Sequence, residues 1–270
     1  MGNTFSGISA EYLLQAEHDI VKHYAGMEPG EYTIEDLDIS EELRQVEKEH
    51  GSKGKSIFNH ESEDNFIHTI NFFNNDPREL TKPRLLLIHG FMANGAQFAP
   101  MLKGLKDTYR VTTIDLLGLG SSGRPAFALT EVQDCIDFFT LSFEAWVLRT
   151  KFREEGPYTL GGHSFGAYIS MNYAIGFPAQ IEKIVMLSPA GVPKKPKEYD
   201  LATYFGLGPS IVNSVVTKFV TSIWGSQYSF ISPLKYMGYK TGDFIIYHYY
   251  KSYYPTLNEA DFQVQKEISI

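Results

Sequence analysis

Cysteine is nearly absent from this sequence, because Cys135 is the only one among 270 residues. A single thiol cannot form a disulfide within the chain, so a disulfide-stabilised fold is excluded and a reducing compartment is favoured. Cys135 lies in the amphipathic segment Asp134-Cys135-Ile136-Asp137-Phe138-Phe139. We therefore expect it to be a small buried hydrophobic residue rather than a reactive thiol.

Positive charge is also scarce, with 24 Lys and Arg residues against 32 Asp and Glu and a net charge of −8. This balance argues against a nucleic-acid partner, which would need a basic surface. It leaves a membrane surface open as a partner, because apolar insertion needs no basic patch. No spacing typical of a metal site is present, and we expect no cofactor.

Long apolar runs are missing as well. None approaches the ~20 residues that span a bilayer, and no basic region followed by an apolar one marks a secretory signal at the N-terminus. We expect a cytoplasmic protein with peripheral membrane association, and leave a mitochondrion or lipid droplet open. Residues 1–6, Met-Gly-Asn-Thr-Phe-Ser, fit a myristoylation pattern with Gly2 as acceptor, although stable anchoring would need a second signal.

Apolar strand patterns alternate with helical patterns through the middle of the chain. Such alternation predicts an α/β fold with a mostly parallel sheet and crossover helices. Strands are expected at 66–73, 84–89, 109–116, 158–161 and 184–187, and helices at 9–24, 39–50, 96–106, 130–150 and 165–176. We expect the helix at 39–50 to be solvated. The predicted organisation is an N-terminal helical extension (1–55), an α/β core (56–190) and a helical, aromatic-rich lid (191–270).

The segment Gly162-His163-Ser164-Phe165-Gly166 matches the Gly-x-Ser-x-Gly pattern of a nucleophile turn. An apolar strand precedes it and a helix-compatible stretch follows, which is the context that the chemistry requires. Flanking glycines remove the Cβ atoms that would clash in so sharp a turn, and the helix directs its first N–H groups at the reacting oxygen. We therefore predict that Ser164 is a nucleophile, or the remnant of one, and that His163 supports the turn.

The segment His89-Gly90-Phe91 follows the predicted strand at 84–89. A loop in this position supplies one donor of an oxyanion hole, and the residue after the nucleophile supplies the other. The predicted donors are the backbone N–H groups of Phe91 and Phe165, with His89 and Gly90 in support. The alternative is a simple glycine turn in which His89 only packs.

A second glycine-rich segment, Gly118 to Gly123, fits Gly-x-Gly-x-x-Gly. A dinucleotide site would require a helix to begin there, but Arg124-Pro125 follows and proline disfavours helix at the residue before it. We expect a loop.

The serine needs a base and an orienting acid, which in this chain order would follow Ser164. His248 is the only later histidine and lies in an aromatic stretch expected to be lid helix. We therefore expect the final strands, with acid and base, to be missing, through a truncated gene model or in a natural pseudoenzyme. The candidate acids are Glu198, Asp200, Asp243, Glu259 and Asp261.

Together these motifs resemble one lipid-acting branch of the α/β hydrolases. That branch contains the lipid-droplet lipase coactivator, a lysophospholipase acting on N-acyl phospholipids, and the mitochondrial cardiolipin deacylase. The segments that carry the resemblance are 115–125 (Asp-Leu-Leu-Gly-Leu-Gly-Ser-Ser-Gly-Arg-Pro), 187–193 (Leu-Ser-Pro-Ala-Gly-Val-Pro), 208–216, 246–248 and 14–17.

The resemblance implies a serine hydrolase of membrane (phospho)lipid acyl esters, phospholipase- or lysophospholipase-like, in lipid homeostasis. It also implies a lipid or lysophospholipid substrate, a membrane or lipid-droplet surface and no cofactor. Acyl transfer is left open, because the family's His-x4-Asp element occurs nowhere in this sequence. The alternative is a non-catalytic lipid-binding coactivator of a lipase, or a pseudoenzyme.

Overall fold

The computed structural model describes residues 10–51, 55–74, 76–91, 93–129, 131–179 and 181–190. The α-helices are α1 (Ala10–Ile20), α2 (Ser40–His50), α3 (Pro77–Leu80), α4 (Ala99–Leu105), α5 (Val132–Arg149) and α6 (Phe165–Gly176). A π-helix, η1 (Val21–Ala25), continues α1, and η2 (Gly95–Phe98) and η3 (Phe152–Glu155) are 3-10 helices. The strands are β1 (Thr33–Asp38), β2 (Phe66–Asn71), β3 (Arg84–Ile88), β4 (Arg110–Ile114), β5 (Tyr158–His163) and β6 (Ile181–Leu187).

The six strands form one sheet in the order β1-β2-β4-β3-β5-β6. β2 runs antiparallel to both β1 and β4, whereas the β3–β4, β3–β5 and β5–β6 pairs are parallel. Helices connect the parallel strands, as crossovers of this kind require. The predicted fold class, a mostly parallel sheet with crossover helices, is confirmed.

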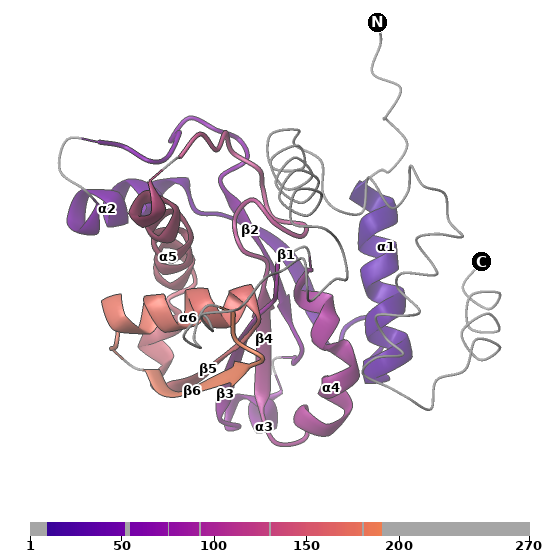
Figure 1. Ribbon diagram of the computed structural model, residues 1–270. Helices are drawn as coiled ribbons and strands as arrows, with labels where there is room; N and C mark the ends of the chain where they lie inside the picture. The colour runs from indigo at the N-terminus through magenta and orange to yellow at the C-terminus, as the bar shows by residue number, and fades with distance from the viewer. Residues whose placement is uncertain are drawn as a thin grey trace, which may run out of the picture. The chain divides into compact units, whose positions relative to one another are not determined.

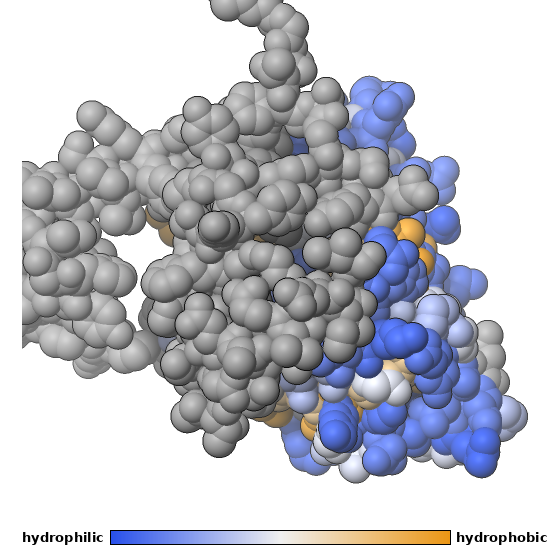
Figure 2. Space-filling view, turned by 90° about the vertical axis from the view of Figure 1, so that its right-hand side faces the viewer, coloured by the Kyte–Doolittle hydropathy of each residue, from blue (hydrophilic) through white to orange (hydrophobic). Residues whose placement is uncertain are grey.

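Helices cover both faces of the sheet. In Figure 1, α1 and α4 lie together on one side of the strands, and α2, α5 and α6 lie on the other. The packing agrees, because η1 contacts α4 while α5 contacts both α2 and α6. Figure 2 shows the side that lies to the right in Figure 1, where the visible described residues are mainly hydrophilic with separated hydrophobic ones between them.

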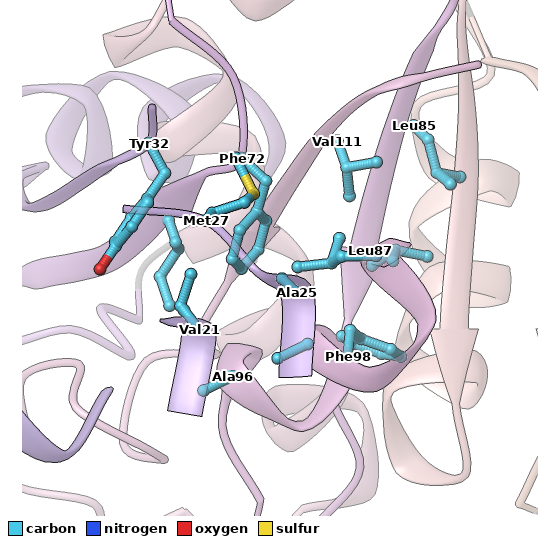
Figure 3. Packing of buried hydrophobic residues seen from close by; sticks show 13 residues of the cluster. Val21, Ala25, Met27, Tyr32, Phe72, Leu85, Leu87, Ala96, Phe98 and Val111 are labelled. Carbon is cyan, nitrogen blue, oxygen red and sulfur yellow. The ribbon is translucent and has the colours of Figure 1, made fainter. Parts of the chain in front are cut away.

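The central strand β3 is buried at every residue. Since successive strand side chains point to opposite faces, Leu85 and Leu87 enter the hydrophobic cluster on the α1–α4 side, and Leu86 and Ile88 face the other layer (Figure 3). The members of that cluster are Val21, Ala25, Met27, Tyr32, Ile70, Phe72, Leu85, Leu87, Ala96, Phe98, Ala99, Leu102 and Val111.

Helix predictions held best where glycine or a strong pattern marks the ends. The segment predicted at 165–176 is α6 residue for residue. The predicted N-terminal helix corresponds to α1 together with η1. It ends at Gly26, which adopts the left-handed conformation (φ 63°) and whose N–H donates to the carbonyl of Lys22. Such a C-cap favours glycine because it carries no Cβ.

The N-terminal region differs from the prediction in two respects. β1 was not predicted, and it carries the sheet across the expected boundary at residue 55. Helix α2 is not fully solvated, since Leu43 and Val46 are completely buried and the helix packs on α5. An acidic helix can still bury a narrow apolar stripe, and that stripe was overlooked.

The apolar run at 184–187, like the one at 84–89, is typical of a strand that is buried on both faces, but for β6 this expectation is wrong. Ile184, Val185 and Met186 are 39%, 42% and 44% exposed. The reason is that no strand among the described residues pairs with the outer edge of β6. The predicted lid, residues 191–270, lies outside the described residues.

Candidate active site

Ser164 occupies a strained turn between β5 and α6. Its backbone has φ 51° and ψ −112°, a combination that non-glycine residues rarely adopt. Backbone strain of this kind costs of order 1–3 kcal/mol and persists only where the surroundings impose it. The strand–turn–helix context predicted from the sequence is therefore present, with Ser164 as the first residue beyond the strand.

The two glycines of the motif are required by close backbone contacts. A Cβ on Gly162 would lie 2.6 Å from the Cα and N atoms of Ala167, and one on Gly166 would overlap the carbonyl oxygens of Ile88 and His89. Backbone atoms cannot move aside as a flexible side chain would. Glycine at both positions lets the chain reverse direction against β3.

The end of β6 and the residues that follow it are hydrogen-bonded to the backbone of Ser164. The Ser164 N–H donates to the carbonyl of Leu187 at 3.0 Å, and the Ala190 N–H donates to the carbonyl of Ser164 at 3.0 Å. Sequence reasoning quoted the 187–193 segment only for its resemblance and assigned it no role. Its backbone bonds both the N–H and the carbonyl of Ser164. The contact could have been predicted if β5 and β6 had been expected to pair.

The loop after β3 touches the turn at Gly90. A Cβ on Gly90 would lie 2.8 Å from Nδ1 of His163 and 3.4 Å from Cβ of Ser164. The sequence-predicted residues His89, Gly90, Gly162, His163, Ser164 and Gly166 are thus brought together in one place.

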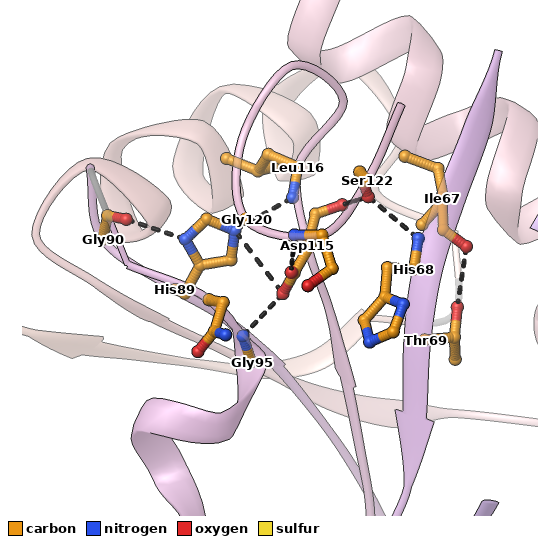
Figure 4. Close-up of polar contacts among 12 residues, drawn as sticks. Ile67, His68, Thr69, His89, Gly90, Gly95, Asp115, Leu116, Gly120 and Ser122 are labelled. Atoms are coloured by element: carbon orange, nitrogen blue, oxygen red, sulfur yellow. Dashed lines mark hydrogen bonds and ion pairs between the residues drawn. The ribbon is translucent and has the colours of Figure 1, made fainter. Parts of the chain in front are cut away.

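His89 is completely buried and hydrogen-bonded through both ring nitrogens (Figure 4). Nε2 accepts from the Leu116 N–H at 3.0 Å, and Nδ1 lies 2.7 Å from the carbonyl oxygen of Gly90. Since an amide N–H only donates and a carbonyl oxygen only accepts, we assign the neutral ring with its proton on Nδ1. His89 therefore joins the loop after β3 to the segment after β4.

This hydrogen bond also orients the Gly90–Phe91 peptide. The carbonyl of Gly90 and the N–H of Phe91 belong to one planar trans unit and point in opposite directions. The Gly90 carbonyl accepts from His89 and from the Ala93 N–H at 3.2 Å. With the carbonyl held from two sides, the direction of the Phe91 N–H is set by the fold.

Asp115, to which the sequence analysis assigned no role, holds two loops together at the carboxyl ends of the parallel strands. It is 1% exposed, accepts from the Gly95 N–H at 2.5 Å and from the Ser121 N–H at 2.6 Å. The bonds to Gly95 and Ser122 are drawn in Figure 4. An aspartate near the end of the otherwise apolar strand predicted at 109–116 was the signal that could have found it. The segment at 118–123 is a loop, as predicted, and no helix begins there.

Aromatic rings adjoin the serine on its helix side. The Phe91 and Phe165 rings meet edge to face with centroids 6.2 Å apart, and Phe165 meets Phe139 at 5.2 Å. Phe91 and Phe165 are half-buried, so both contribute apolar surface beside Ser164. Such a surface suits a hydrocarbon group better than a charged one.

The side chain of His163, next to Ser164, favours its neutral form. Burial lowers the pKa of His163. A group that loses its proton readily in this position is not a source of positive charge at neutral pH.

The sequence analysis expected the acid and base to be missing, and the structure does not test this, because the residues considered for these roles lie outside its described part. His248 and the candidate acids Glu198, Asp200, Asp243, Glu259 and Asp261 lie outside it, as does Gly2. Within the described part, no hydrogen bond involves the Ser164 hydroxyl. The same part holds no group of three or more His, Cys, Asp or Glu residues arranged to bind a metal.

A cavity of about 300 Å³ lies at the opposite, amino end of the parallel strands, away from Ser164. Its lining includes Asn71, Arg110, Thr112, Trp146, Arg149 and Glu155. Cys135 is half-buried, and burial raises the pKa of its thiol, so it is a poor nucleophile at neutral pH. In the described helices, no stretch is long and apolar enough to cross a membrane.

Comparison with known proteins adds three findings. A family model described as "alpha/beta hydrolase fold" matches residues 83–266. The 1-acylglycerol-3-phosphate O-acyltransferase of Arabidopsis thaliana is 32% identical over 141 residues, which are 52% of this chain and 32% of that protein. The (lyso)-N-acylphosphatidylethanolamine lipase of Homo sapiens is 29% identical over 127 residues, which are 44% of this chain and 34% of that protein.

The chain spans about a third of the length of these curated relatives. Among solved structures, a bacterial membrane phospholipase A matches with a TM-score of 0.49 and 21% identity, covering 75% of this chain and 55% of that one.

Proposed function

This chain belongs to the α/β-hydrolase fold family, and from that premise we propose that it is a serine hydrolase acting on acyl esters of membrane phospholipids. The resemblance to a lipid-acting branch is confirmed, because the curated relatives include a lysophospholipid acyltransferase and an N-acylphosphatidylethanolamine lipase. The observation that carries the proposal is the strained turn at Ser164 packed against the Gly90–Phe91 peptide.

In the proposed reaction, Ser164 Oγ attacks the ester carbonyl carbon while a general base, which the described residues do not supply, takes its proton. The N–H groups of Phe91 and Phe165 stabilise the oxyanion that develops on the carbonyl oxygen. Phe165 opens α6, and the first N–H groups of a helix have no acceptor within it. Collapse of the intermediate expels the protonated alcohol, and water then releases the fatty acid from the acyl-serine.

Two features support an acyl lipid as substrate. The half-buried rings of Phe91 and Phe165 put apolar surface next to the nucleophile. The names of the relatives describe both hydrolysis and acyl transfer, which differ in whether water or an alcohol accepts the acyl group. We propose hydrolysis, because the family's His-x4-Asp element is missing from the sequence.

The proposed setting is the cytoplasmic surface of a membrane or lipid droplet. Gly2 is the candidate lipidation site, and a lipase is the candidate protein partner if the chain acts by regulation instead of catalysis. A nucleic-acid partner is disfavoured by the net charge of −8.

The test is covalent labelling of the folded 270-residue chain with a fluorophosphonate probe, which reacts with activated serines. We expect labelling in the wild type and in Ser170→Ala, and none in Ser164→Ala. Ser170 is a matched control, since it lies in the same helix and its hydroxyl has no hydrogen-bond partner among the described residues. Failure of the folded wild-type chain to label would refute the enzymatic proposal and favour a lipase-regulating role.

A further inference from the structure

An ionic cluster centred on the buried side chain of His68 joins α1 to the sheet, and the sequence analysis assigned none of its members a role. His68 on β2 has a side chain only 6% exposed. Its Nδ1 lies 2.6 Å from the carboxylate of Asp36 on β1, and its Nε2 lies 3.0 Å from the carboxylate of Glu17 on α1. We call Glu17, Asp36 and His68 the His68 cluster.

The cluster carries charge at neutral pH. Burial by itself would lower the pKa of His68, but hydrogen bonds to Asp36 and Glu17, with the nearby charge of Asp115, raise it to about 10. The imidazolium donates from both nitrogens, so each carboxylate has a fixed partner. A buried charge of this kind is costly to form and more costly to leave unpaired.

The second oxygen of Glu17 reaches the loops at the carboxyl edge of the sheet. Oε1 accepts from the side-chain amide of Asn94 at 3.3 Å and from the hydroxyl of Ser121 at 3.2 Å. Asn94 lies three residues after Phe91 in the same loop, and Ser121 lies in the loop after β4. One carboxylate, on a residue that is 4% exposed, therefore contacts three separate parts of the chain.

We infer that Glu17 is a positioning residue that holds the 89–95 loop, and with it the Gly90–Phe91 peptide, against Ser164. An effect on catalysis depends on the proposed function, whereas the contacts of Glu17 with the loops do not. His68 holds one Glu17 oxygen, which leaves the other directed at the loops. Helix α1 thereby becomes part of the support of the active site rather than an outlying extension.

The competing explanation is that Glu17 only neutralises His68. Asn94→Ala separates the two, because it removes the loop's contact and leaves all three members of the His68 cluster in place. Glu17→Gln is the second variant. An amide has one acceptor oxygen, so the substituted side chain can accept from His68 or from the loops but not from both.

The primary readout is hydrogen exchange of the backbone amides in residues 89–95, measured by mass spectrometry on the 270-residue chain. We expect exchange in this segment to rise at least about threefold in both variants, since losing a stabilising contact eases local opening. The matched control is Ser121→Ala, which removes a donor to the same Glu17 oxygen from the other loop. It should leave exchange in residues 89–95 unchanged.

The second readout is the rate of fluorophosphonate labelling of Ser164. We expect Asn94→Ala to slow it about threefold to tenfold, the range that one hydrogen bond supplies, with Ser121→Ala at the wild-type rate. Unchanged exchange in both Asn94→Ala and Glu17→Gln would overturn the inference. If the wild type fails to label, the proposed function falls, while the exchange measurements still decide whether Glu17 holds the loop.

Discussion

The turn at Ser164 and the His68 cluster hold the same edge of the sheet, but by different forces. The turn is held by close packing, because Gly162 and Gly166 leave room for no further atom beside the backbone of β3 and α6. The cluster is held by charge, through a protonated ring between two carboxylates. One region is sensitive to added volume, and the other is sensitive to lost charge.

The difference follows from what each region must do. A nucleophile turn has to keep a strained backbone at a single place, and steric contacts impose this at every pH. The cluster has to connect elements that are 51 to 104 residues apart in sequence, for which short-range packing of neighbours is not available. Ionic hydrogen bonds from one carboxylate supply three such connections.

The largest effect is expected from adding a methyl group to the turn. In Gly166→Ala, the new Cβ would overlap two backbone carbonyl oxygens, so the turn must distort. We expect the free energy of unfolding to fall by about 3 kcal/mol or more, with loss of labelling. Urea unfolding measures the first quantity and fluorophosphonate labelling the second.

Gly176→Ala is the matched control, because it lies in the last turn of the same helix with no atom within 4 Å of its added Cβ. It should leave labelling intact and stabilise the chain by up to about 1 kcal/mol. Equal stability of the two alanine variants would show that packing does not hold the turn.

A smaller effect is expected at His89, which is buried and also makes two hydrogen bonds. His89→Phe keeps a ring of similar shape but removes the donor to the Gly90 carbonyl and the acceptor for the Leu116 N–H. With the Gly90–Phe91 peptide free to turn, we expect labelling of Ser164 to slow about tenfold to a hundredfold, below the full loss of one oxyanion donor.

The control for His89→Phe is Trp146→Phe, which removes a buried hydrogen bond to Thr69 near the cavity at the other end of the strands. It should lower stability and leave the labelling rate of the folded protein unchanged. Similar labelling rates in His89→Phe and wild type would show that other contacts orient the peptide.

The same contrast explains what could be predicted from the sequence. The turn, the loop at His89 and the strand β3 are specified by residues within a few positions of one another, so pattern and glycine placement are sufficient. Strand β1 was missed because Glu35, Asp36 and Asp38 make it acidic, and as an edge strand it buries little. Its pairing with β2 is what makes it a strand.

The roles of Glu17 and His68 could not be predicted, because no local pattern around either residue shows which partners it contacts. Their roles depend on the packing of α1 beside β2, and on the two loops whose residues Asn94 and Ser121 donate to Glu17. The exposure of β6 was likewise hidden, since an apolar run predicts a strand but does not show whether a neighbour covers it. Whether Ser164, Phe91 and Phe165 act in catalysis stays a prediction.

The last test addresses the charge of the cluster directly, through the pH dependence of stability. His68 has a folded-state pKa of about 10, above its ordinary value of about 6.5. A raised folded-state pKa stabilises the fold fully below about pH 6.5, and this contribution is lost as pH rises toward 10. The charged groups facing the ring are Glu17 from α1, Asp36 from β1 and Asp115 beyond β4.

We therefore expect the difference in unfolding free energy between wild type and His68→Gln to be largest at about pH 6 and to shrink steadily up to about pH 10. Urea unfolding at about pH 6, 8 and 10 measures it. Trp146→Phe, which removes an uncharged hydrogen bond, should differ from wild type by a constant amount over the same range. A pH-independent difference for His68→Gln would mean that the ring is neutral, and that shape rather than charge holds both regions of this edge.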